Sequence, residues 1–205
     1  MSHATCLVIM QEEDSLDEIM APYDENSDDP RYVKFIDRTA SLKQSAKEQN
    51  KSLRQVAEEW SYIEKAPGTN KWGYIGNPNG YWDWWTVGGR WNGYLKLKDT
   101  IKYGNMVIPP YALSGPPDEA NPYPYPYPGC NSCILEDFDY EGQKAALGVE
   151  HLFFSVIKNG KWYSGGLMGW FGYADIRGPR WDEKEAKLIA SASKKSKAVL
   201  VDFHI

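Results

Sequence analysis

Aromatic, glycine and arginine residues gather in one short stretch, WDWWTVGGRW, residues 82–91. Tryptophan faces stack on flat rings such as nucleobases, which contributes about 1–3 kcal/mol per base. The guanidinium of Arg90 can hold a phosphate through paired hydrogen bonds, and Gly88 and Gly89 would let backbone N–H groups approach the same anion. Asp83 could accept a hydrogen bond from a base edge. This stretch is therefore a candidate pocket for a flat, anionic ligand.

The same stretch also has a structural interpretation. Alternation along a strand would place Trp82 and Trp84 on one face, and Asp83 and Trp85 on the other. One such row could fill the core, and Arg90 could form an internal ion pair with Asp83. The glycine pair lacks the G-x-x-x-x-G-K-[ST] spacing of a phosphate-binding loop, so the motif does not decide between core and pocket.

A second glycine-rich segment, residues 165–178, carries Trp170 between glycines. Glycine hinges are typical of lids that close over a ligand, and a tight connection anchored by the indole is the structural alternative. The complete set of predicted ligand-binding residues is Trp82, Asp83, Trp84, Trp85, Gly88, Gly89, Arg90, Trp91 and Trp170.

Residues for acid–base catalysis lie near the two ends of the sequence. Asp202 and His204, two positions apart, would share one face of a strand, and pairing of the first and last strands would bring His3 beside His204. If the protein is an enzyme, these three residues are its catalytic candidates as general acid and base; satisfied structural polar residues are the alternative. A two-histidine phosphoesterase would need a repeated H-x-T/S pair, and HAT at residues 3–5 has no second copy.

Cysteine usage argues against a metal centre. Cys130 and Cys133 form one C-x₂-C pair, which is half of a typical zinc site, while Cys6 and the histidines are scattered. We therefore expect two free thiols at this pair, no metal and no cofactor. An odd number of cysteines, with no secretion signal at the N-terminus, indicates a reducing compartment such as the cytoplasm.

Composition narrows the classes of partner. The chain has 205 residues, which fits a single domain, and its aromatic content of 14% indicates that most of it packs. A net charge of −5 argues against binding of long nucleic acids, whose partners are usually basic. No apolar run is long enough for a membrane span, so we expect no membrane partner.

Patterning along the chain predicts an α+β fold. Residues 3–10 and 197–205 read as strands, residues 40–65 as one long amphipathic helix, and residues 181–195 as a helix with acidic residues in its first turn. The KNGK turn within 150–166 predicts a hairpin. We expect a mixed or antiparallel sheet with helices on one face, in ferredoxin-like topology. Residues 99–135, rich in proline and containing PYPYPYP, read as a surface insertion.

Several blocks of the sequence resemble a known group of proteins. The blocks are MAPYDEN at 20–26, NPN…WDWWTVGGRWNGYL at 77–95, KNGKWYSGGLMGWFG at 158–172 and VDFHI at 201–205. They are similar to the APYDEN, NPNxxWDWYxxGGRWxG, MGWWG and C-terminal VDCHI-like motifs of a family of small, mostly uncharacterised proteins encoded by bacteriophages. The proline-tyrosine insertion is not part of that pattern, and Phe203 replaces a frequent cysteine.

The resemblance implies a phage-encoded accessory protein in the host cytoplasm, a context in which counter-defence is common. We therefore expect a protein that binds and sequesters a small nucleotide-derived immune signal through the Trp/Gly-Gly-Arg pocket, as a homo-oligomer. The alternatives are a phosphodiesterase-like enzyme that degrades such a signal, and a protein-binding inhibitor of a host factor that uses the PYPYPYP strip.

Overall fold

The computed structural model describes residues 3–98, 125, 127, 129–168, 174–175 and 180–204. These residues group into two compact units, Met1–Ile19 with Trp82–Ile205 and Met20–Tyr81. Each unit is described by itself, and the expectation of a single domain stays a prediction.

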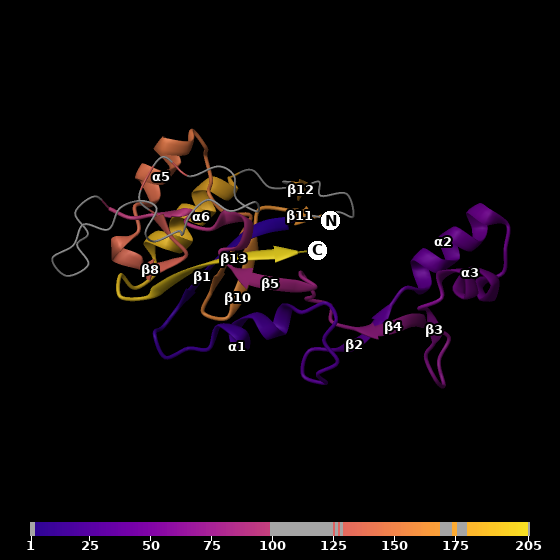
Figure 1. Cartoon of the computed structure of the whole chain (residues 1–205). Helices are drawn as coiled ribbons and strands as arrows, with labels where there is room; N and C mark the ends of the chain where they lie inside the picture. Colours follow the sequence, from indigo (N-terminus) through magenta and orange to yellow (C-terminus); the bar gives the residue numbers. More distant parts are fainter. Residues whose placement is uncertain are drawn as a thin grey trace. The chain divides into compact units, whose positions relative to one another are not determined.

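The first unit is built on a mixed six-stranded sheet in the order β10-β9-β1-β13-β5, with β8 also pairing with β13 (Figure 1). The first and last strands pair antiparallel along their whole length, as expected from the sequence, and β9 runs parallel to β1 on its other edge. The strands are β1 (His3–Met10), β5 (Trp84–Val87), β8 (Ser132–Ile134), β9 (Ser155–Lys158), β10 (Lys161–Ser164) and β13 (Lys197–His204). The α+β fold class is confirmed.

The two central strands are almost continuously buried, which explains their near-continuous apolar sequences. Leu7 of β1 and Leu200 of β13 are register partners with no exposed surface, and they belong to the core of this unit together with Phe153. Antiparallel pairing also places His3 opposite His204 and Thr5 opposite Asp202. The same two strands therefore carry apolar core residues in their middle and the polar residues His3, Asp202 and His204 at one end.

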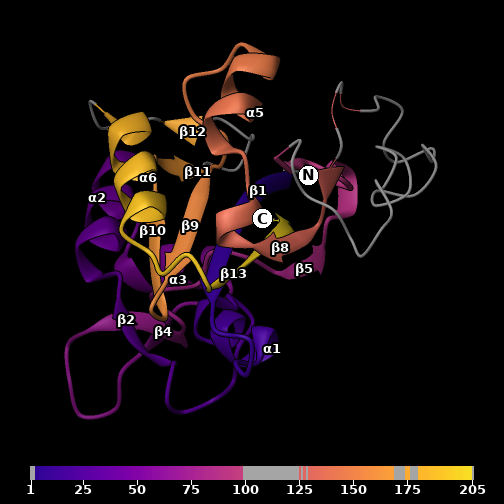
Figure 2. The ribbon, with the colours of Figure 1, turned by 90° about the vertical axis from the view of Figure 1, so that its left-hand side faces the viewer.

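Helix α6 (Trp181–Ala190) lies against β9, and α5 (Tyr140–Leu147) is the second helix of this region (Figure 2). Glu185 of α6 is fully buried and accepts hydrogen bonds from the Tyr140 hydroxyl at 2.9 Å, the Leu152 N–H at 2.9 Å and the Phe153 N–H at 3.1 Å. Burial raises the pKa of Glu185. One carboxyl group therefore ties α6 to α5 and to the loop before β9.

The hairpin between β9 and β10 has the turn that its sequence predicts. Asn159 and Gly160 have φ values of 52° and 65°, and positive φ at both central residues is the requirement of a type I′ turn.

The C-x₂-C pair lies in the core rather than at the surface. Cys130 in β7 (Gly129–Cys130) and Cys133 in β8 are free thiols, 5% and 6% exposed. Cys133 is buried because β8 pairs with β13, where it faces Ala198. The last part of the expected insertion, 129–135, is thus packed, whereas residues 99–124, 126 and 128 lie outside the described residues.

The second unit has a three-stranded antiparallel sheet in the order β2-β4-β3 and two helices (Figure 1). Leu42 and Val56 are buried between the helices, in a small core of their own. The elements are β2 (Lys34–Asp37), α2 (Thr39–Gln49), α3 (Leu53–Trp60), β3 (Glu64–Lys65) and β4 (Trp72–Gly76).

The expected long helix at 40–65 is two helices instead. Asn50 adopts the left-handed conformation with φ of 52° and ends α2. Ser52 then starts α3 through a capping box, in which its hydroxyl accepts from the Gln55 N–H and its own N–H donates to the Gln55 side chain. Local capping therefore overrides the continuous apolar stripe.

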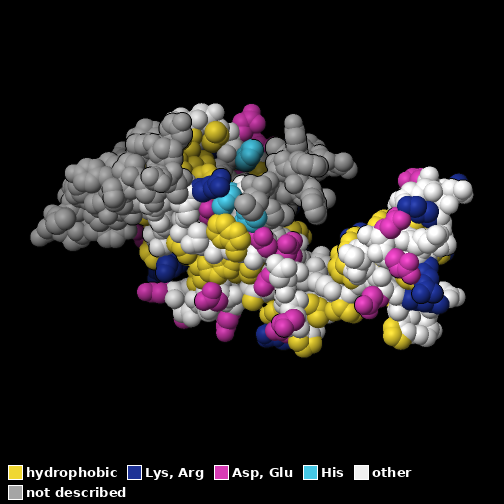
Figure 3. All heavy atoms as spheres, turned by 45° about the vertical axis from the view of Figure 1, so that its right-hand side comes forward, with side chains coloured by type: hydrophobic (Ala, Val, Ile, Leu, Met, Phe, Trp, Pro, Cys, Tyr) yellow, Lys and Arg dark blue, Asp and Glu magenta, His cyan; other side chains and the backbone are white. Residues whose placement is uncertain are grey.

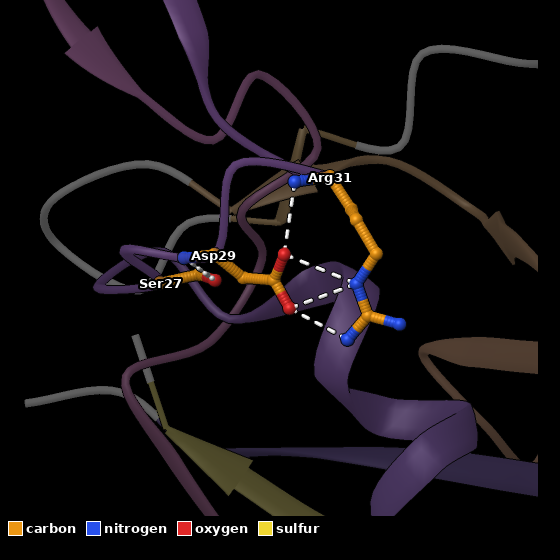
Figure 4. Close-up of polar contacts among 3 residues, drawn as sticks. All are labelled: Ser27, Asp29 and Arg31. Atoms are coloured by element: carbon orange, nitrogen blue, oxygen red, sulfur yellow. Dashed lines mark hydrogen bonds and ion pairs between the residues drawn. The ribbon is translucent and has the colours of Figure 1, made fainter.

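A polar turn precedes β2 in this unit. The Asp29 carboxylate accepts hydrogen bonds from the Arg31 N–H at 2.9 Å and from Arg31 Nη2 at 2.6 Å, and the Asp29 N–H donates to the Ser27 hydroxyl at 3.3 Å (Figure 4). The Arg31 hydrogen bonds lower the pKa of Asp29. The arrangement is a local turn stabilised by its own charges.

The remaining short elements are α1 (Leu16–Met20), η1 (Ala21–Tyr23), η2 (Gly89–Trp91), β6 (Leu95–Lys96), η3 (Leu135–Asp137), β11 (Leu167–Met168) and β12 (Ala174–Asp175). Within the described part of the chain, we find no helix with the length and apolar character that crossing a bilayer requires.

Candidate functional site

Two histidine–aspartate pairs lie side by side at one end of the central sheet. His3 and His204 are register partners on β1 and β13, and their ring centroids are 5.2 Å apart with the planes at 69°. Asp202 lies two residues before His204 on the same strand face, and Asp83 immediately precedes β5. The three residues proposed as acid–base candidates are thus brought together, and Asp83 from the aromatic stretch joins them.

The first pair is held from two directions. His3 Nδ1 lies 2.9 Å from Asp202 Oδ1, and the Arg90 N–H donates to Asp202 Oδ2 at 2.9 Å. The Asp202 side chain is only 1% exposed. An ionised carboxylate only accepts hydrogen bonds, so against ionised Asp202 a neutral His3 ring carries its proton on Nδ1 and has Nε2 as its acceptor.

The second pair repeats this geometry on the next strand. His204 Nδ1 lies 2.6 Å from Asp83 Oδ1, and the Asp83 N–H donates back to the His204 carbonyl at 3.0 Å. The His204 side chain is 6% exposed, and its Nε2 has no hydrogen-bond partner among the described residues. Both imidazoles therefore have Nδ1 against a carboxylate, and the Nε2 of His204 is a buried nitrogen.

Trp84 completes the cluster as an aromatic wall. Its ring stacks on the His204 imidazole with centroids 5.4 Å apart and planes at 12°, and it meets His3 edge-on at 5.1 Å. Although it contacts both histidines, Trp84 remains 43% exposed. Figure 3 shows histidine atoms (cyan) at the surface of one face of the molecule, with apolar side chains (yellow) nearby. The indole of Trp84 is therefore the most exposed part of the cluster, while the side chains of His3 and His204 are 10% and 6% exposed.

The double glycine brings one backbone N–H, that of Arg90, to the protein's own Asp202 carboxylate, whereas a ligand phosphate was the anion expected there. Gly88 and Gly89 have φ values of 73° and 52°. A Cβ on Gly89 would lie 2.3 Å from Asp202 Oδ2. Only glycine at position 89 allows the Arg90 N–H to reach this carboxylate.

The side chain of Arg90 is exposed. Among the described ion pairs none joins Arg90 to Asp83, because Asp83 lies against His204 instead. The internal Asp83–Arg90 pair that the sequence left open is therefore not formed.

The other tryptophans of the stretch pack inside the unit. Trp82 is buried and meets Trp85 edge-to-face at 6.5 Å, although strict alternation would have separated them. Trp82 precedes β5, so the alternation of the strand does not extend to it. Trp91 is half-buried against the core, and Trp170 lies outside the described residues.

Asn131 lies between the two cysteines of CNSC and was missed by reasoning from the sequence. It contacts the turn of residues 88–93, whose Arg90 N–H donates to Asp202. Its side chain accepts from the Gly93 N–H at 2.7 Å. The sequence signal for this role was the position of Asn131 between Cys130 and Cys133, two residues whose side chains are buried.

Histidines with Nδ1 on a carboxylate also occur around bound metals, where Nε2 is the ligand. The described residues contain no group of three or more histidine, cysteine, aspartate or glutamate side chains that could hold a metal ion. Two imidazoles that each have Nδ1 against a carboxylate have the arrangement of groups that transfer protons.

Comparisons with known proteins add no family to this geometry. Searches of protein-family models, curated proteins and solved structures found no match to the chain.

Proposed function

We propose that the two histidine–aspartate pairs are the catalytic site of a hydrolase that cleaves a phosphodiester bond in a small nucleotide-type substrate. The observation that carries this proposal is the pairing of His3 with His204 on neighbouring strands. Their ring centroids are 5.2 Å apart, and each Nδ1 lies against its own carboxylate. Two imidazoles in this arrangement can act as the general base and the general acid of one reaction.

The surroundings of the two rings assign their roles. Trp84 stacks on His204, and an aromatic face stabilises a neighbouring cation. His204 is therefore the protonated ring that donates a proton to the leaving oxygen. His3, with Nε2 unprotonated, accepts the proton from water while the water oxygen bonds to phosphorus and the bond to the leaving oxygen breaks. The two carboxylates hold the rings and balance the imidazolium charge.

The exposed indole supports the substrate class. Trp84 offers a stacking surface for a base next to the reacting groups. The resemblance to phage-encoded proteins supports a nucleotide-derived immune signal in the host cytoplasm as the natural substrate.

For the fold, ferredoxin-like topology stays the proposal that goes beyond the observed α+β arrangement.

Product analysis tests this function. The purified protein is incubated with bis(p-nitrophenyl) phosphate and with cyclic dinucleotides, and the products are separated by chromatography. We expect cleavage by the wild type, loss of cleavage in His204→Ala, and retained cleavage in His151→Ala, which removes the remaining histidine of the chain. Cleavage that persists in His204→Ala would remove this residue from the mechanism.

A second candidate function is capture of the same class of ligand without cleavage, and the exposed face of Trp84 favours it. The same experiment separates the two functions. A sequestering protein releases chemically intact ligand when it is denatured by heat, whereas a hydrolase releases products. Failure to bind or cleave any of these ligands would count against both.

A further inference from the structure

The turn that holds Asp202 is itself held by Asn131. Asn131 Oδ1 accepts a hydrogen bond from the Gly93 N–H at 2.7 Å, and its Nδ2 donates to Asn92 Oδ1 at 2.6 Å. The Asn131 carbonyl accepts from the Leu200 N–H at 2.8 Å. One half-buried residue thus joins the end of the turn to the central strand β13.

The two glycines of the turn each make room for one polar side chain. A Cβ on Gly88 would lie 2.5 Å from Asn131 Nδ2, and a Cβ on Gly89 would lie 2.3 Å from Asp202 Oδ2. The turn is therefore packed between the Asn131 carboxamide and the Asp202 carboxylate, and a methyl group at position 88 or 89 would force one of these groups or the turn to move.

Asn131 lies between β7 and β8, opposite the point on β13 where two strand pairings meet. Strand β5 pairs with residues 201–204 of β13, and β8 pairs with residues 197–199. Between these two ladders lies Leu200, whose carbonyl accepts from the Gly88 N–H at 3.0 Å and whose N–H donates to Asn131. The turn therefore lies beside β13 at the gap between β5 and β8, and Asn131, which directly precedes β8, binds the Gly93 end of the turn.

We propose that Asn131 is a positioning residue for the His3–Asp202 pair, an inference that rests on the proposed function. The carboxamide fixes the end of the turn, so that the Arg90 N–H points at Asp202 Oδ2 and Asp202 Oδ1 faces His3 Nδ1. Loss of the carboxamide releases the turn and lets the Asp202 carboxylate rotate. His204 is unaffected, because Asp83 fixes its Nδ1 from another segment.

The test compares the two histidines within one protein. Nitrogen-15 NMR of the imidazole rings reports which ring nitrogen carries the proton. We expect Asn131→Ala to shift His3 from the Nδ1–H form towards the mixture of a free imidazole, with His204 unchanged. The matched control is Asn70→Ala, an exposed asparagine of the second unit, which should leave both rings as in the wild type.

A milder variant covers the case in which Asn131→Ala fails to fold. Asn131→Gln keeps the neutral carboxamide on a side chain one methylene longer, so it should shift His3 in the same direction but less. If the His3 ring of a folded Asn131 variant matches the wild type, or if both rings shift equally, the proposal is wrong.

Kinetics provide a second readout. Asn131→Ala should lower kcat for the phosphodiester roughly tenfold with little change in KM, because the defect is in the alignment of a reacting group rather than in binding. The NMR measurement needs no turnover. A wild type without hydrolysis therefore overturns the proposed function, whereas an unchanged His3 ring overturns the role of Asn131.

Discussion

At the scale of single residues, the stacking of Trp84 on His204 is the contact that distinguishes the two imidazoles. Both rings have a carboxylate on Nδ1, but only His204 is nearly parallel to the indole, at 12°, while the plane of His3 is at 77° to it. A cation gains more from the face of an aromatic ring than from its edge. The asymmetry supports His204 as the acid and His3 as the base.

Replacing Trp84 tests this asymmetry. Trp84→Ala removes the face that stabilises the imidazolium, a contact of about 0.5–2 kcal/mol, so kcat should fall by roughly threefold to thirtyfold. Trp84→Phe keeps an aromatic face and should recover part of the loss. Steady-state kinetics on bis(p-nitrophenyl) phosphate measure both variants. Equal kcat values in the wild type and Trp84→Ala would contradict the role of the indole.

Glu185 offers a prediction about stability and pH. Burial raises the pKa of this carboxyl in the folded state, so the folded protein holds the proton more tightly than the unfolded chain does. The stability that comes from this proton is complete below the unfolded pKa of about 4.3 and is lost as pH rises through the folded pKa.

Glu185→Gln removes that pH dependence and also weakens the acceptor for three donors. We expect the variant to be less stable by about 1–3 kcal/mol, with a larger deficit at pH 5 than at pH 8. Urea unfolding at both pH values gives the two free energies of unfolding. A deficit that is larger at pH 8 would contradict the direction of the pKa shift.

At the scale of elements, the turn from Gly88 to Gly93 fixes the orientation of the Asp202 carboxylate through the Arg90 N–H. Its 3-10 helix η2 points the Arg90 N–H at the carboxylate because position 89 has no Cβ. The function of the double glycine is therefore indirect. The two glycines allow the Arg90 N–H to bind the Asp202 carboxylate, and this carboxylate orients His3.

Gly89→Ala should displace Asp202 and lower kcat by roughly a hundredfold. Gly148→Ala is the matched control, because Gly148 also has positive φ, 67°, but open space around its Cβ position. The control should cost about 1 kcal/mol of stability and leave turnover intact. If both variants lose turnover equally, backbone strain rather than the Asp202 clash explains the loss.

These elements also show what the sequence could and could not predict. Long apolar runs at both ends predicted β1, β13 and their pairing, and this pairing is what brings His3 to His204. The break at Asn50 was not predictable from periodicity, because one left-handed residue interrupts α2 and α3 without changing their apolar stripe. Likewise, the glycine pair suggested a ligand phosphate near Gly88 and Gly89, and nothing in the sequence indicated that the Arg90 N–H meets Asp202, which is 112 positions away in the chain.

At the scale of the whole molecule, the site is assembled from distant parts of the chain. His3, Asp83 and Asp202 come from three segments that meet only because β1, β13 and the segment leading into β5 lie adjacent in one sheet. Both histidines therefore depend on the core of the first unit. The second unit has a separate core around Leu42, which is fully buried.

Separate cores predict separate responses to mutation. Leu42→Ala should destabilise the second unit by about 2–5 kcal/mol. Hydrogen exchange of backbone amides should accelerate in α2 and α3, while amides of β1 and β13 keep their protection. Acceleration of all four elements together would show instead that the two units unfold as one.

The most direct test of the catalytic site is a double-mutant cycle on the two histidines. Turnover of bis(p-nitrophenyl) phosphate is measured for the wild type, His3→Ala, His204→Ala and the double variant. If the rings act as the base and acid of one reaction, each single variant loses roughly a hundredfold to ten-thousandfold and the double variant loses little more. Single variants that turn over as fast as the wild type would contradict the account, as would losses that simply multiply in the double variant.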